Sequence, residues 1–401
     1  MATKEHKDHE RGGAGQGVLF LRSLRSFGAK VFLLFFLLPP TAWAGEFRGA
    51  WVAAVHNINF PAAQGQSIEA QKTQILRILE TAKRCRLNAL MVQVRPEGDA
   101  LYASRFEPWS RFLTGTQGVN PGYDPLAFFI SEGKKRSIEI HAWLNPYRAS
   151  ASFSKANAAN HVTKRFPQYT YKVGTVLLMD PGAPEVQDHV VNVVRDIISR
   201  YDVAGIHFDD YFYPYPTNSG SVYSFPDEAT FRQYGGGLSR GDWRRSNVNT
   251  LIRKVSSVVH SKPGAKFGVS PFGIYQPGVP AGTTAGVDMF NQLYADPLKW
   301  MREGWIDYLS PQLYWREGGP QSFSLLLRWW RSPQANPRGV AIWPGIAVDR
   351  LGSHGWQSGE IGGQLQLEKS LGPRGQGGFI LWNIKALQNG TKGVDAVVAG
   401  N

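Results

Sequence analysis

The sequence has 401 residues, of which 42% are hydrophobic and 19% charged, so it can bury a substantial core and is not a disordered chain. A single cysteine excludes a disulfide framework and a cysteine-based zinc site. The net charge of +13 favours anionic surfaces such as cell-wall glycan or phospholipid headgroups, but no Lys/Arg-rich cluster indicates a nucleic-acid partner.

Residues 1–44 have the features of an export signal. Basic residues precede a short apolar run at 31–38, and Ala42-Trp43-Ala44 matches an A-x-A cleavage site. The run is shorter than the roughly 20 apolar residues that a membrane-spanning helix needs. We therefore expect residues 1–44 to be a signal peptide and residues 45–401 a periplasmic or secreted protein without a stable membrane span. An uncleaved N-terminal anchor is the alternative.

Short apolar runs rich in β-forming residues alternate with amphipathic helical patterns along the rest of the chain. The runs predict strands at 47–55, 88–96, 138–146, 205–213, 266–273, 306–315, 339–348 and 377–386. Helices are predicted at 69–85, 124–136, 185–200, 243–261, 296–304, 322–331 and 360–371. Asp124, Asp296 and Ser322 are the expected caps of three of them.

Eight such repeats without a low-complexity linker predict an α/β fold, namely a closed (β/α)₈ TIM barrel spanning residues 45–401. A doubly wound open sheet is the alternative. Long insertions at 148–180 and 211–240 follow the third and fourth predicted strands. Insertions of that length either wall a cleft or are variable decoration.

Polar side chains recur at every second position near the ends of four predicted strands. They are Gln93, Arg95 and Glu97; His141, Trp143 and Asn145; His207, Asp209 and Tyr211; and Ser310, Gln312 and Tyr314. Period-two alternation places each set on one side of its strand. The carboxyl ends of barrel strands are where such enzymes keep their active sites, so we expect these sets to converge.

Two adjacent carboxylates, Asp209 and Asp210, end the fourth predicted strand and are followed by aromatic residues. Alternation lets only one of them face the barrel mouth, and the face shared with His207 favours Asp209. Asp210 would then orient a loop or a neighbouring strand. The structural alternative is that both carboxylates cap backbone amides.

Hydrolysis of a glycosidic bond needs a second carboxyl group across that bond. Glu97 ranks first, because it shares a face with Gln93 and Arg95 at the appropriate strand end, although an ion pair with Arg95 or Arg148 would also explain it. Other candidates are Glu317 and Asp349, whereas Glu185 fits better as a residue that stabilises a helix N-terminus.

Aromatic and amide side chains near the predicted mouth suit sugar binding, because flat rings match the C–H faces of pyranoses. Taken singly, most of these aromatic residues are core fillers, and the cluster carries the argument. The candidate substrate-binding residues are Arg95, His141, Trp143, Asn145, His207, Tyr211, Gln312, Tyr314, Trp315, Trp382 and Asn383.

A metal-dependent deacetylase or amidohydrolase is the enzymatic alternative. His56, His141, His207 and Asp209 could supply ligands, but no second His-x-His or carboxylate cluster completes the usual set, so we expect no metal or other cofactor. A non-catalytic barrel that binds glycan through its aromatic residues is the third alternative.

Five segments resemble the glycosyl-hydrolase-like family 10. They are Phe47-Arg48-Gly49-Ala50-Trp51-Val52, the run from Val92 to Tyr102, His141-Ala142-Trp143-Leu144-Asn145-Pro146-Tyr147-Arg148, the run from Gly205 to Pro214, and Ser310-Pro311-Gln312-Leu313-Tyr314-Trp315. The resemblance implies a (β/α)₈ fold and action on bacterial envelope glycan, in particular on peptidoglycan strands stripped of stem peptides, as in the family's divisome-localised member.

The leading hypothesis is therefore an exported glycoside hydrolase that cleaves peptidoglycan glycan, with the cell-division machinery as a candidate partner. Asp209 is its nucleophile or base and Glu97 its acid, while Asp210 and His207 support them.

Overall fold

A computed structural model describes residues 45–217, 223–372 and 377–401. Contacts between Cα atoms group residues 40–401 into one compact unit, to which all of these residues belong. The expected signal peptide at 1–44 lies outside the described residues. None of the described helices combines the length and the apolarity that crossing a bilayer requires.

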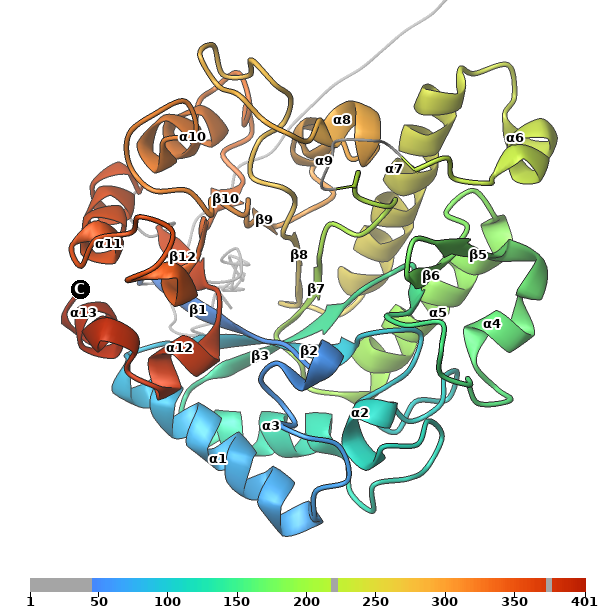
Figure 1. Ribbon diagram of the computed structural model, residues 1–401, viewed down its shortest axis with the longest axis horizontal. Coiled ribbons are helices and arrows are strands. Elements are labelled where there is room, and N and C mark those ends of the chain that lie inside the picture. The colour runs from blue at the N-terminus through green and yellow to red at the C-terminus, as the bar shows by residue number, and fades with distance from the viewer. Residues whose placement is uncertain (1–44, 218–222, 373–376) are drawn as a thin grey trace, which may run out of the picture. The chain divides into compact units, whose positions relative to one another are not determined.

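The main sheet is parallel throughout and contains nine strands in the order β10-β9-β8-β7-β3-β2-β1-β12-β11 (Figure 1). Its strands are β1 (Phe47–Val52), β2 (Ala89–Arg95), β3 (Glu139–Leu144), β7 (Gly205–Phe208), β8 (Lys266–Val269), β9 (Tyr308–Leu309), β10 (Ala341–Ile342), β11 (Gly345–Ile346) and β12 (Gly378–Leu381). Each predicted strand therefore contains an observed one, and the seventh is split into β10 and β11 at Trp343 and Pro344. A curled parallel α/β sheet is confirmed, while the closed eightfold barrel stays a prediction.

Helices lie around the outside of the strands in Figure 1. The seven predicted helices correspond to α1 (Ile68–Arg84), α3 (Pro125–Lys134), α5 (Pro184–Arg200), α7 (Arg240–Val259), α9 (Pro297–Glu303), α10 (Phe323–Trp330) and α11 (Glu360–Leu371). Sequence reasoning missed α2 (Arg111–Thr114), α4 (Val162–Arg165), α6 (Glu228–Tyr234), α8 (Met289–Gln292), α12 (Ile384–Gln388), α13 (Val394–Gly400) and the short 3₁₀ turns Val55–Asn57, Pro167–Tyr169, Val348–Arg350 and Thr391–Gly393.

The expected caps are confirmed at two of the three helices. The Asp124 carboxylate accepts the Ala127 N–H at 2.9 Å, and that of Asp296 accepts the Lys299 N–H at 3.1 Å. Ser322 precedes α10 without capping it through its side chain. Instead, Glu317 accepts the Ser324 N–H at 3.0 Å, so one candidate acid serves a helix N-terminus.

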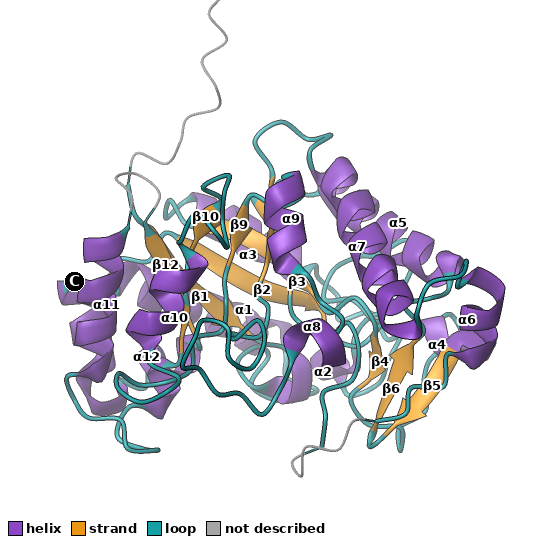
Figure 2. Cartoon of the chain, turned by 90° about the horizontal axis from the view of Figure 1, so that it is seen from above, coloured by secondary structure: helices purple, strands orange, loops and turns teal. Residues whose placement is uncertain are grey.

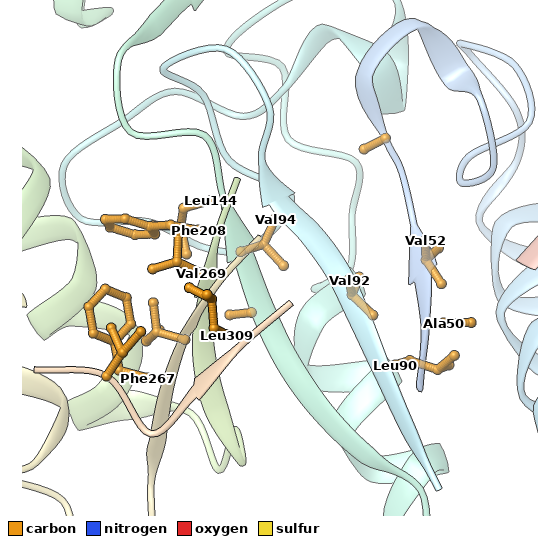
Figure 3. Close-up of a cluster of buried hydrophobic side chains, with 14 of the residues drawn as sticks. Ala50, Val52, Leu90, Val92, Val94, Leu144, Phe208, Phe267, Val269 and Leu309 are labelled. Atoms are coloured by element: carbon orange, nitrogen blue, oxygen red, sulfur yellow. The ribbon is translucent and has the colours of Figure 1, made fainter. Parts of the chain in front are cut away.

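Side chains alternate between two buried clusters, as period-two spacing requires. One cluster packs against the helices and includes Val52, Leu90, Val92, Leu144 and Phe208, drawn in Figure 3. The other lies on the opposite face of the sheet and contains Phe47, Trp51, Ala53, Ala89, Met91, Trp143, Tyr308, Trp343 and Ile380. The site is built above this second cluster.

Both long insertions carry structure of their own. After β3 come β4 (Arg148–Ser150), α4 (Val162–Arg165), β5 (Thr170–Val173) and β6 (Val176–Met179), and the three strands form an antiparallel sheet in the order β4-β6-β5. After β7 comes α6 (Glu228–Tyr234). Figure 2 shows the small sheet and α6 beside one another, away from the main sheet.

Candidate active site

A pocket of about 300 Å³ lies where the main strands end. Residues from the ends of β1 and β3 and from the segments that follow β7, β8, β9, β11 and β12 line it: Trp51, Trp143, Asp209, Asp210, Tyr211, Ser270, Gln312, Tyr314, Ala347, Asp349, Arg350 and Trp382. Carboxyl groups and aromatic rings therefore share one cavity, which is the combination expected from the strand-end pattern.

Asp209 is buried and held by donors from the neighbouring β3 segment. Its Oδ2 accepts hydrogen bonds from Trp143 Nε1 at 3.1 Å and from Asn145 Nδ2 at 3.0 Å. Burial raises the pKa of Asp209, while the positive charge of Arg148 and the two donors act in the opposite direction. These donors fix the carboxylate in place and favour its charged form.

Asp210 is also buried, and its pKa is raised to about 7 by burial and by the negative charge of Asp209. Its Oδ2 accepts hydrogen bonds from the Tyr215 hydroxyl and from Gln312 Nε2, the latter at 3.1 Å. Because both donors reach the same oxygen, Oδ1 is the oxygen that can carry a proton. A carboxyl that titrates near neutral pH is suited to general acid chemistry.

Both aspartates line the pocket, which differs from the expectation that only one would face it. Strand β7 ends at Phe208, five residues before the end of the predicted strand. Beyond that point the chain bends, so alternation no longer sends neighbouring side chains to opposite faces.

The two histidines lie deeper than the pocket. The hydroxyl of Tyr308 is 3.1 Å from Nδ1 of His141 and 3.1 Å from Nδ1 of His207. A Cβ on Gly268 would lie 2.0 Å from the Tyr308 ring, so a glycine is needed there to admit it. These two expected substrate-binding residues are therefore fully buried and do not line the pocket.

His207 is held neutral. Trp51 Nε1 donates to His207 Nε2 at 3.1 Å, and because an indole N–H can only donate, Nε2 is an acceptor and the proton lies on Nδ1. Burial lowers the pKa of His207 well below its usual value. Among the residues the structure describes, no three His, Cys, Asp or Glu side chains gather where they could hold a metal ion.

Glu97 and Arg95 lie away from the pocket. Glu97 forms an ion pair with Arg111. It lines a separate cavity of about 250 Å³ with His56 and Lys155. Arg95 forms a buried ion pair with Glu107, with 2.6 Å between Nη2 and Oε1. Strand β2 has a register shift between Gln93 and Arg95 and ends there, so the predicted face does not continue to Glu97.

The remaining candidates divide between the pocket and its surroundings. Tyr211, Gln312, Tyr314 and Trp382 line the pocket with Trp143, whereas Asn145 supports Asp209. Trp315 instead packs edge-on against Phe272, with ring centroids 5.6 Å apart. Asn383 accepts a hydrogen bond from Asn59 at 2.9 Å and caps α12.

One acid and several other residues line the pocket although the sequence did not favour them. Asp349 was weighed below Glu97, yet it lines the pocket with Asp209 and Asp210. Trp51, Ser270 and Arg350 were not among the candidates. Asp349 and Arg350 follow the predicted seventh strand, so extending the strand-end argument to that strand would have found them.

Comparisons with known proteins agree with this architecture. Residues 46–358 match the family described as glycosyl hydrolase-like 10. The glycosyl hydrolase YngK of Bacillus subtilis (strain 168) is 39% identical over 319 residues, which are 77% of this chain and 62% of that protein. The glycosyl hydrolase DigH of Escherichia coli (strain K12) is 36% identical over 329 residues, 76% of this chain and 74% of that protein. The match thus spans less than two thirds of the Bacillus relative.

Solved structures of glycoside hydrolases share the fold, among them the catalytic domain of β-amylase from Paenibacillus polymyxa. That domain is 12% identical with a TM-score of 0.55, and the alignment covers 86% of this chain and 94% of the domain. The fold is thus one that glycoside hydrolases share, and the pocket holds the pair of carboxyl groups that glycosidic hydrolysis requires. The chain belongs to the glycosyl hydrolase-like 10 family, as its motifs predicted.

Proposed function

We propose that this protein is an exported glycoside hydrolase that cleaves the glycan strands of peptidoglycan, with peptide-free strands as its substrate. The observation that carries the proposal is the pair Asp209 and Asp210 in one aromatic-walled pocket, where the pKa of Asp210 is about 7. The choice of peptidoglycan rests on the family resemblance of the motifs, and the basic composition of the chain suits an anionic polymer.

Asp210 is the general acid in this proposal. Its Oδ1 carries the proton at neutral pH and delivers it to the glycosidic oxygen as the bond to the anomeric carbon breaks. Tyr215 and Gln312 hold the other oxygen, so the carboxyl has one orientation in the pocket. The role given to Glu97 from the sequence passes to Asp210, because Glu97 faces a different cavity.

Asp209 is the charged partner. Its carboxylate either attacks the anomeric carbon or takes a proton from the attacking water. Trp143 and Asn145 keep Oδ2 in place, while the positive charge of Arg148 favours the ionised form. Rings of Trp51, Tyr314 and Trp382 offer flat surfaces to the sugar.

We also propose that the main sheet closes into the eightfold barrel. Only Trp343 and Pro344 separate β10 from β11, and these two strands pair with β9 and β12 respectively. The Trp343 N–H donates to the Leu309 carbonyl at 2.9 Å, and the Ile380 N–H donates to the Pro344 carbonyl at 3.0 Å. Read as one interrupted strand, β10 and β11 join the two edges of the sheet.

The test is cleavage of purified peptide-free glycan strands, with new reducing ends measured by mass spectrometry. We expect products with the wild-type protein and none above background with Asp209→Asn or Asp210→Asn. The control is Asp188→Asn, an exposed acid that pairs with Lys254 at 2.8 Å on the helical exterior. Glycan that is retained by the wild-type protein but never cleaved would identify a binding protein and refute the proposal.

Export and a link to cell division are further parts of this proposal, supported by the composition of residues 1–44 and by the family resemblance. Fractionation of cells that produce the full chain tests export. Recovery of a shortened protein beginning near Gly45 from the periplasm or the medium is the expected result, and full-length protein in the cytoplasm would contradict it.

A further inference from the structure

We propose that Arg148 binds a carboxylate carried by the glycan, in a second pocket that adjoins the catalytic one, so that the enzyme selects sugars with a free acidic substituent. This inference rests on the proposed function and names the chemical feature of the substrate that the site recognises.

The second pocket has a volume of about 450 Å³ and lies against the insertion sheet. Its lining includes Val176 and Leu178 from β6, together with Tyr211, Tyr213 and Tyr215 from the segment after β7. Tyr211 lines both pockets, and Tyr215 reaches from the second pocket to Asp210. A glycan bound at the aspartates therefore continues past Tyr211 into this space.

Arg148 is the one charged side chain among the described residues that line the second pocket. It is 9% exposed, and its Nε donates to the Pro96 carbonyl at 2.9 Å. Neither Nη1 nor Nη2 makes a hydrogen bond or an ion pair with another described residue. Buried guanidinium groups are normally paired, so these two donors are available to an anion that enters the pocket.

Two contacts restrict the conformation of Arg148. Its backbone N–H donates to Asn145 Oδ1 at 2.8 Å, which ties it to the residue that also holds Asp209. Its guanidinium carbon lies 5.1 Å from the centre of the Tyr211 ring. The hydrogen-bonded stem and the contact with the Tyr211 ring leave the outer nitrogens little conformational entropy to lose on binding.

A carboxylate fits this arrangement because it accepts two parallel hydrogen bonds from a guanidinium fork. In peptidoglycan every second sugar carries a lactyl ether, whose carboxyl group is bonded to the stem peptide through an amide. Removal of the peptide frees that carboxylate. Recognition by Arg148 would thus explain, in chemical terms, a requirement for peptide-free strands.

The test compares two forms of one polymer, namely peptide-free strands and the same strands after their carboxyl groups have been converted to methylamides. We expect the wild-type enzyme to cleave the charged form with a kcat/KM about 10- to 100-fold higher, the range for hydrogen bonds to a charged group. Arg148→Gln should reduce this ratio to near one, whatever its effect on the absolute rates. Arg148→Lys should keep part of the preference, because lysine retains the positive charge but lacks the two parallel N–H donors of the guanidinium.

The matched control is Arg245→Gln, because the Arg245 guanidinium also lies over a ring, that of Phe290, but outside both pockets. It should leave the ratio unchanged. Equal cleavage of both polymers by the wild-type enzyme would overturn the inference and leave the proposed function standing. An unchanged preference in Arg148→Gln, with both rates lowered, would show that Arg148 acts only on Asp209. Failure of the wild-type enzyme to cleave either polymer would refute the proposed function itself.

Discussion

Oε1 of Glu97 lies 2.8 Å from Nε of Arg111, and both side chains are buried. The other oxygen, Oε2, accepts the Ala151 N–H at 2.6 Å, from the loop that follows β4. Arg111 also donates to Asn157 Oδ1 at 2.6 Å. The carboxylate thus links the segment after β2 to α2 and to the loop after β4, away from the pocket that holds Asp209 and Asp210.

Glu97→Gln should therefore lower stability more than it lowers turnover. The glutamine can still accept from Ala151, but it leaves the charge of Arg111 uncompensated in a buried place, which costs roughly 3 kcal/mol. Urea denaturation should show the reduced free energy of unfolding, while kcat on glycan stays close to that of the wild-type protein. A roughly 100-fold loss of kcat at unchanged stability would restore Glu97 as a catalytic acid.

Asp210→Asn should remove most of the activity on glycan, by roughly 10²- to 10⁴-fold, because the leaving oxygen then receives no proton. Aryl glycosides with a p-nitrophenolate leaving group need little protonation, so the loss on such substrates should be much smaller. Steady-state rates on the two substrate types measure the difference. Equal losses on both would mean that Asp210 is not the acid.

Tyr215→Phe should move the alkaline limb of the activity profile to higher pH. The Tyr215 hydroxyl stabilises the charged form of Asp210, so its removal raises the pKa of that carboxyl above about 7. Since the acid works in its protonated form, activity then persists to higher pH. The pH dependence of kcat/KM tests this.

The control for this variant is Tyr169→Phe. The Tyr169 hydroxyl also donates to a carboxylate, that of Glu185 at 3.3 Å, but it lies outside the pocket. It should leave the alkaline limb where it is. A limb that moved to lower pH in Tyr215→Phe would contradict the assignment of Asp210 as the acid.

Alternation and capping residues predicted the strands and helices because both depend on local spacing. The same spacing predicted the face of β3 and β7 on which His141 and His207 lie. It did not predict that both rings are buried below the pocket, because this depends on their contacts with Tyr308 from β9. It also could not follow the chain past Phe208, where the turn brings Asp210 into the pocket beside Asp209. How deeply a side chain is buried and where a strand ends both depend on tertiary contacts, so periodicity carries no information on either.

The two buried ion pairs could not be predicted from the sequence for a related reason. Arg95 was assigned to substrate and Glu97 to catalysis because periodicity does not place their partners, Glu107 in a loop and Arg111 in the short helix α2. Buried charges are nearly always paired, so a search for nearby residues of opposite charge would have weakened both assignments.

Asp210 should also make the stability of the folded protein fall as pH rises. Its pKa is about 7 in the folded protein, above the ordinary aspartate value of 3.8, so the folded state binds the proton more tightly than the unfolded state. The stabilisation from that proton is fully present below about pH 4 and is lost as pH rises through about 7. Asp210→Asn removes this dependence, so its Tm should exceed that of the wild-type protein by more at pH 8 than at pH 5. Thermal unfolding at the two pH values measures the gap, and a gap that did not widen with pH would show that Asp210 is already ionised near pH 5.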